Sequence, residues 1–137
     1  MDLFLQILYT VLILGFLIFI HELGHFTVAK LSKIKVNEFS LGMGPAVFKK
    51  QGRETLYSLR LLPIGGYVKM EGEDENSEDP NSFSQKPVLI RMAVVVAGAF
   101  MNLLLGLIVT AILVSTSAKL PSVTVGEFTE NALSQTC

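Results

Sequence analysis

Apolar residues are concentrated in two long stretches of the chain, separated by a segment of mixed polarity. The stretches Leu3–Ile20 and Met92–Val114 contain 18 and 23 residues with few polar side chains. A helix needs about 20 apolar residues to cross about 30 Å of hydrocarbon. The pattern therefore predicts a mainly α-helical membrane protein with two transmembrane helices.

The first helix is expected to continue beyond its purely apolar part. No Gly-Pro break interrupts the chain between Ile20 and Leu31, and apolar residues recur throughout this segment. A helix from Leu3 to Leu31 would be about 43 Å long, at 1.5 Å per residue. We therefore assign residues 1–31 to the first transmembrane segment and residues 88–116 to the second.

The segment between the helices changes its hydrophobic period. Apolar residues alternate with other residues over 36–48 and again over 55–63, which is typical of half-buried strands. Gln51-Gly52-Arg53 lies between these runs and indicates a turn. Residues 32–70 are therefore predicted to form a β-hairpin or small sheet.

Residues 71–87 are rich in acidic side chains, with Asn, Ser and Pro between them. The spacing of ligands and glycine that defines an EF-hand is absent from this segment. A solvated, flexible linker is the expected structure, in preference to a calcium site.

The distribution of charge suggests an orientation in the membrane. Ten of the 11 Lys and Arg residues lie between the two apolar stretches or at the edge of the second. Positive residues favour the cytoplasmic side, so the central loop is expected in the cytoplasm and both termini outside. The formal net charge of −1 gives no indication of a nucleic-acid partner, and the expected partner is the lipid bilayer. Because no basic segment precedes the first stretch, a retained helix is favoured over a cleaved signal peptide.

Candidate chemistry lies in the first helix, where His21-Glu22-Leu23-Gly24-His25 fits the pattern H-E-x-x-H. Helical residues four apart share a face, so both imidazoles can reach one ion. Glu22 points beside that ion and can act on a water molecule as a general base. A charged side chain within a membrane helix costs about 3 kcal/mol on insertion scales, and a bound metal would compensate for this cost. The alternative is a polar cluster at the membrane edge that reaches into water.

Several motifs together resemble the site-2 protease family (peptidase family M50) of intramembrane zinc metalloproteases. The resemblance is to the bacterial branch that cleaves anti-sigma factors, the regulator-of-sigma-E type. The zinc motif on the first span, the glycine-rich strand Phe39–Pro45 and the reentrant β-loop Tyr57–Met70 all have counterparts in this chain. The second-span motif is similar to Ala97–Asn102, and Val123–Glu127 resembles the opening strand of an extracytoplasmic PDZ domain.

The resemblance implies a zinc metalloendopeptidase of the bacterial inner membrane that cleaves transmembrane segments in regulated intramembrane proteolysis. It makes His21 and His25 zinc ligands and Glu22 the catalytic base. It also implies that Gly65, Gly66 and Tyr67 bind unfolded substrate by strand addition, and that Asn102 contacts the substrate or the active-site loop. From the residues alone, a plain structural hairpin accounts for each of the first three somewhat better, and Asn102 fits a hydrogen bond between helices equally well. Residues 117–137 would begin a truncated PDZ domain.

The chain departs from the family pattern at two places. Ala99 stands where the family usually has proline, which affects a local kink. More seriously, a catalytic zinc usually has three protein ligands, and the family's third ligand is an Asp on a later transmembrane helix. Neither apolar stretch contains an Asp. We therefore expect the chain to be an N-terminal fragment that is inactive alone. The alternative function is a non-catalytic, metal-binding membrane hairpin or an inactive fragment.

Overall fold

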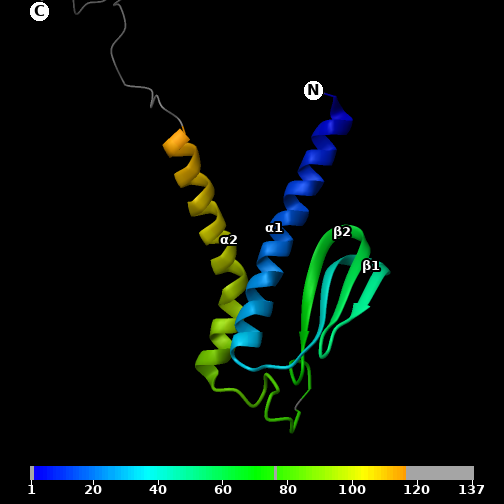
Figure 1. Cartoon of the computed structure of the whole chain (residues 1–137), viewed down its shortest axis with the longest axis vertical. Coiled ribbons are helices and arrows are strands. Elements are labelled where there is room, and N and C mark those ends of the chain that lie inside the picture. The colour runs from blue at the N-terminus through cyan, green and yellow to red at the C-terminus, as the bar shows by residue number, and fades with distance from the viewer. Residues whose placement is uncertain (1, 76, 117–137) are drawn as a thin grey trace, which may run out of the picture. The chain divides into compact units, whose positions relative to one another are not determined.

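Two long helices and a pair of strands make up the computed structural model, which describes residues 2–75 and 77–116. The elements follow the order α1 (Leu3–Leu31), β1 (Val36–Gln51), β2 (Leu56–Met70) and α2 (Val88–Thr116), and α1 lies between α2 and the strands (Figure 1). Both helices are long and apolar enough to cross a membrane. Two membrane-spanning helices with an antiparallel hairpin between them agree with the sequence prediction. The expected PDZ segment lies outside the described residues.

Helix α1 runs without interruption through the H-E-x-x-H sequence, as predicted. It ends because Lys33 adopts a left-handed conformation with φ of 55°. The Ile34 amide then donates a hydrogen bond to the Ala29 carbonyl oxygen at 2.9 Å and turns the chain into β1. Helix α2 starts directly after Pro87, whose carbonyl oxygen accepts hydrogen bonds from the Ile90 and Arg91 amides. Proline has no amide hydrogen to leave unpaired, so it suits the start of a helix.

The two helices pack closely at Gly24. A Cβ atom built on Gly24 would lie 2.5 Å from the carbonyl oxygen of Ala97 and 2.8 Å from Cγ of Met101. Real Cβ atoms do not approach other atoms so closely, so only glycine fits there. Small residues at helix interfaces allow two backbones to approach in this way. This contact fixes α1 against the first half of α2.

The strands are longer than the sequence pattern indicates. The alternation predicted a second strand over residues 55–63, but strand β2 continues through Pro63 to Met70. Strands β1 and β2 pair antiparallel, and the chain bends so that Phe39 lies beside Val68 on one side and Tyr57 on the other. Gly65 supports this bend with φ of 79°, a conformation that other residues rarely adopt.

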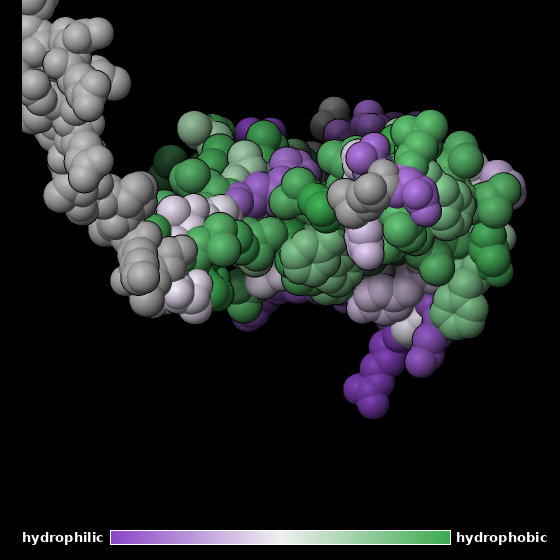
Figure 2. All heavy atoms as spheres, turned by 90° about the horizontal axis from the view of Figure 1, so that it is seen from above, coloured by the Kyte–Doolittle hydropathy of each residue, from purple (hydrophilic) through white to green (hydrophobic). Residues whose placement is uncertain are grey.

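Several large apolar side chains of the hairpin are exposed. Leu59, Leu61 and Ile64 are 48%, 62% and 63% exposed, whereas Ser40 and Ser58 are buried. Other strand residues at the end of the hairpin near the loops do form an apolar core: Val36, Phe39, Val68 and Met70. Apolar residues cover much of the face seen in Figure 2. An outward apolar surface is favourable where lipid, rather than water, is the surrounding solvent.

The buried side of the hairpin contains a charged network centred on Arg60. Its guanidinium donates hydrogen bonds to Oγ of Ser40 at 2.8 Å, to the carboxylate of Glu38 at 3.2 Å and to the hydroxyl of Tyr67. Partial burial alone would raise the pKa of Glu38, but hydrogen bonds from Ser58, Tyr67 and Arg60 outweigh it and lower that pKa. The network therefore holds Glu38 as a carboxylate and joins the two strands.

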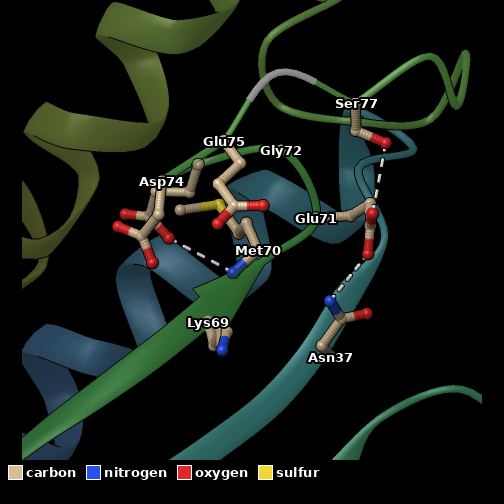
Figure 3. A pocket seen from close by; sticks show the side chains of 9 residues that line it. Asn37, Lys69, Met70, Glu71, Gly72, Asp74, Glu75 and Ser77 are labelled. Carbon is tan, nitrogen blue, oxygen red and sulfur yellow. Dashed lines mark hydrogen bonds between the residues drawn. The ribbon is translucent and has the colours of Figure 1, made fainter.

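The acidic segment after β2 is tied to the start of β1, which the prediction of a flexible linker missed. The Glu71 amide donates to the carbonyl oxygen of Lys35, and the Lys35 amide donates to that of Asn81, both at 2.9 Å. The Glu71 carboxylate also accepts hydrogen bonds from Asn37 and Ser77 (Figure 3). These bonds close a small polar hollow of about 330 Å³ beside the end of β2. Backbone pairing and specific polar contacts order this loop despite its acidic composition.

Candidate metal centre

His21 and His25 bring two ring nitrogens together on one face of α1. Their Nε2 atoms are 3.2 Å apart, and both side chains are partly buried. Two nitrogen ligands of a tetrahedral zinc ion, each about 2.05 Å from the metal, would be about 3.3 Å apart. The pair therefore already has the separation that shared coordination of zinc requires.

Helix α2 closes the other side of this pair. Nδ1 of His25 is 2.7 Å from the carbonyl oxygen of Val94, and Nδ1 of His21 is 3.5 Å from Nδ2 of Asn102. A carbonyl oxygen can only accept, so His25 carries its proton on Nδ1 and presents the lone pair of Nε2. In metal sites, such a bond from the outer nitrogen orients a histidine ligand.

Gly98 lies between these two contacts and packs directly against both rings. A Cβ atom at this position would be 2.7 Å from Nε2 of His21 and still closer to Nε2 of His25. A larger residue would therefore push both imidazoles away. The separation of the two Nε2 atoms and the contacts of both outer nitrogens with α2 fit two ligands of a zinc ion.

The sequence analysis missed the roles of Val94 and Gly98. The spacing of Gly98, Asn102 and Gly106 does predict a face that another helix can approach. Gly98 and Asn102 face α1 as expected, but a Cβ atom at Gly106 would meet nothing within 4 Å. A backbone carbonyl leaves no sequence signal at all, so Val94 could not have been found.

Glu22 lies between the histidines and β2. A Cβ atom built on Gly66 would lie 2.9 Å from Cγ of Glu22, so the strand passes directly over this side chain. Glu22 lines two clefts, of about 340 Å³ and about 270 Å³. The larger also contains His25 and Tyr67, and the smaller contains His21 and Asn102. The carboxylate therefore has open space on both sides.

The four tentative substrate-binding residues lie in two places. Gly65 and Gly66 line the smaller cleft together with Asn102, on opposite sides of α1's polar face. Tyr67 lines the larger cleft, and its hydroxyl accepts a hydrogen bond from Arg60. The structure thus brings all four to the walls of the clefts that Glu22 shares.

A third metal ligand does not join the two histidines in the part of the chain that the structure describes. No group of three or more His, Cys, Asp or Glu side chains able to hold a metal occurs within residues 2–75 and 77–116. Asp79 instead accepts a hydrogen bond from the amide of Asn81, and Asp74 lies at the polar hollow after β2 (Figure 3). The described residues therefore supply two imidazoles and one adjacent carboxylate.

Comparison with known proteins assigns this arrangement to a family. The profile described as "Peptidase family M50" matches residues 9–137. A protein of Clostridium acetobutylicum named "Putative zinc metalloprotease" is 47% identical over 133 residues, which cover 96% of this chain and 39% of that protein. Proteins of the same name from Fusobacterium nucleatum and Helicobacter pylori (strain 26695) are 49% and 39% identical, covering 82% and 90% of this chain and 33% and 37% of theirs.

The chain thus spans about two fifths of the length of the curated relatives it matches, or less. The matched part includes most of α1, the whole hairpin and α2. Family M50 is zinc-dependent, in agreement with the paired imidazoles on α1. By sequence, and with a fold and a donor set that agree, this chain belongs to peptidase family M50, the site-2 protease family.

Proposed function

We propose that this chain carries part of the active site of an intramembrane zinc endopeptidase. The observation that supports this proposal most directly is the separation of the His21 and His25 Nε2 atoms, which is 3.2 Å. Next to this pair, Glu22 lines two clefts that leave free space. Zinc held by the histidines would polarise a water molecule and the carbonyl of the bond to be cut. Glu22 takes the proton of the attacking water and can return it to the leaving amine.

A third protein ligand completes a site of this kind. We propose that it comes from outside these 137 residues, from the Asp on a later helix that the family resemblance implies. The chain by itself is then expected to bind zinc weakly and to cleave nothing. The names of the relatives support zinc as the metal and proteolysis as the reaction, because each contains the words "Putative zinc metalloprotease".

Substrates are proposed to be transmembrane segments, of which anti-sigma factors are the type that the resemblance implies. Peptide bonds in a helix are shielded by their own hydrogen bonds, so cleavage requires local unwinding. Strand β2 passes beside Glu22 at Gly66, where an extended peptide could pair with the strand. We assign Gly65, Gly66 and Tyr67 to this contact, within regulated intramembrane proteolysis.

The hairpin is proposed to enter the bilayer from the cytoplasmic side of the inner membrane. The Pro63 carbonyl oxygen is 3.7 Å from the position of a Cβ atom on Gly15. Gly15 lies 15 residues before Lys30, about 22 Å along the helix. If Lys30 marks the cytoplasmic boundary, the outward apolar side chains of the hairpin reach well into the hydrocarbon. This orientation leaves both termini outside.

The test compares Glu22→Gln with His25→Ala in the native full-length protein. Gln keeps the size of Glu22 but cannot accept the proton, so cleavage of a transmembrane peptide should fall about 10²–10⁴-fold while zinc stays bound. His25→Ala should lose both zinc and cleavage, because it deletes a ligand. Zinc content and cleavage are measured on the same samples. Full activity of Glu22→Gln would refute the proposed mechanism and favour a metal-binding hairpin without catalysis.

A further inference from the structure

The two histidines are anchored to α2 at points on either side of Gly98. His25 reaches the Val94 carbonyl oxygen and His21 reaches Asn102, while their Nε2 atoms converge between these anchors. Val94 and Asn102 are eight residues apart, about 12 Å along a helix. That distance accommodates two imidazole rings with their Nε2 atoms facing each other. The arrangement suggests that α2 sets the direction of both rings.

The contact between His21 and Asn102 fits the metal-free protein and would have to change when a metal binds. Because His25 presents the lone pair of its Nε2 atom, Nε2 of His21 carries the proton between the two rings, and Nδ1 of His21 accepts from Nδ2 of Asn102 at 3.5 Å. A histidine that ligates a metal through Nε2 instead carries its proton on Nδ1. Nδ1 of His21 would then point a hydrogen at the Nδ2 amide group of Asn102, which is itself a donor. On the other side of the same carboxamide, Oδ1 of Asn102 is buried and has no hydrogen-bond partner among the described residues.

With a metal bound, rotation of the carboxamide by 180° removes the conflict between the two donors. The oxygen and nitrogen of an Asn side chain have nearly the same shape and are assigned from their hydrogen bonds. After this rotation the Asn102 oxygen accepts the proton of His21 Nδ1, and the amide nitrogen takes the buried position without a partner among the described residues. The rotated form makes one hydrogen bond where the unrotated form sets two donors against each other, so it is favoured whenever His21 holds a metal through Nε2.

We propose that Asn102 is a positioning residue of the metal centre, whose side-chain oxygen accepts a hydrogen bond from Nδ1 of His21. The bond fixes the tautomer and the ring direction of His21, as the Val94 carbonyl oxygen does for His25. This inference rests on the proposed function, because it requires that His21 ligates zinc. It replaces direct contact with the substrate as the principal role of Asn102.

The experiment uses the native full-length protein with Asn102→Leu, Asn102→Asp and the control Leu103→Ala. Leucine has a similar volume and no acceptor, whereas aspartate keeps an acceptor oxygen. Loss of such an outer partner typically weakens metal affinity about 10–100-fold. We expect this loss in Asn102→Leu, measured by competition with a zinc chelator, and near-normal affinity in Asn102→Asp. Leu103 is 62% exposed on the same helix, and its variant should bind zinc normally.

Two further readouts separate this role from its competitors. The absorption spectrum of the Co²⁺-substituted protein should change in Asn102→Leu and be restored in Asn102→Asp. If Asn102 instead donates to the substrate, both variants should raise KM and leave zinc affinity unchanged, which would overturn the proposal. Failure of the proposed function would appear differently, as zinc affinity that is unaffected by His25→Ala.

A measurement without mutation covers the case in which Asn102→Leu does not fold. ¹⁵N spectra of the zinc-loaded protein with labelled histidine should show His21 bound to metal through Nε2 and protonated at Nδ1. Zinc on Nδ1 of His21 would overturn the proposal, because Asn102 would then have no proton to accept.

Discussion

Gly98→Ala is the sharpest test of the metal centre, because a single methyl group would press against both ligand rings. The new Cβ atom would lie 2.7 Å from Nε2 of His21, whereas ordinary van der Waals contact begins at 3.4 Å. The His21 ring must therefore move by about 0.7 Å, and His25 must move further. Metal–ligand distances tolerate only about 0.2 Å. Zinc binding should be lost.

The size of the effect of Gly98→Ala on zinc affinity follows from two opposing effects of the substitution. Alanine is favoured over glycine within a helix by about 0.5–1 kcal/mol, so the substitution does not by itself threaten the fold. Displacing the ligands should cost at least as much as losing an outer partner, so we expect zinc affinity to fall about 100-fold or more. The displacement of the ligands therefore outweighs the gain in helix stability. The substitution should weaken zinc binding and leave folding intact.

The assay measures zinc affinity by chelator competition and helix content by circular dichroism on the native full-length protein. Gly106→Ala is the matched control, because the same substitution eight residues along α2 places its Cβ atom more than 4 Å from any neighbour. The control should bind zinc as the unaltered protein does. Normal zinc affinity in Gly98→Ala, with intact helices, would refute the reasoning that both rings must keep their places beside Gly98 to bind the metal.

Two further predictions concern topology and pH. The topology test uses single cysteines in a Cys137→Ser background and a membrane-impermeant thiol reagent on intact cells. A cysteine replacing Asp2 should react, and one replacing Glu75 should not. The opposite result would reverse the orientation. Because hydrogen bonds lower the pKa of Glu38, its contribution to hairpin stability should be present above the ordinary carboxyl pKa and be lost as the pH falls through the lowered value. Hydrogen exchange of hairpin amides should show this loss, and the same loss in Glu38→Gln would show that another group is responsible.

The elements of the fold follow closely from hydrophobic pattern. Length and apolarity predict both helices, and the period-two alternation predicts strands where they occur. The extent of β2 was underestimated, because Pro63 and the paired glycines Gly65 and Gly66 indicate a break rather than a bent strand. The acidic loop was misjudged because backbone bonds join its residues Glu71 and Asn81 to Lys35, which composition does not reveal.

Only the part of the candidate site that belongs to a sequence motif could be predicted. His21, Glu22 and His25 follow from helical spacing, and the structure places their side chains around shared space. The contribution of α2 depends on how two distant helices cross. His25 and Val94 are 69 residues apart in sequence, and nothing local indicates that they meet. Tertiary contacts of this kind require coordinates.

Gly24 gives the H-E-x-x-H sequence a role in helix packing as well as in metal binding. It occupies one of the two positions that the motif leaves unspecified, yet its backbone is in contact with Ala97, where no side chain fits. Exchanging these five residues for the corresponding ones of a water-soluble metalloprotease, with a bulky residue at this position, would transfer every ligand and still push the helices apart. The anchors on α2 would then move away from both histidines. In this protein the motif cannot be exchanged for that of another metalloprotease without loss, because one turn of helix contains both the metal-binding residues and the glycine at which the helices pack.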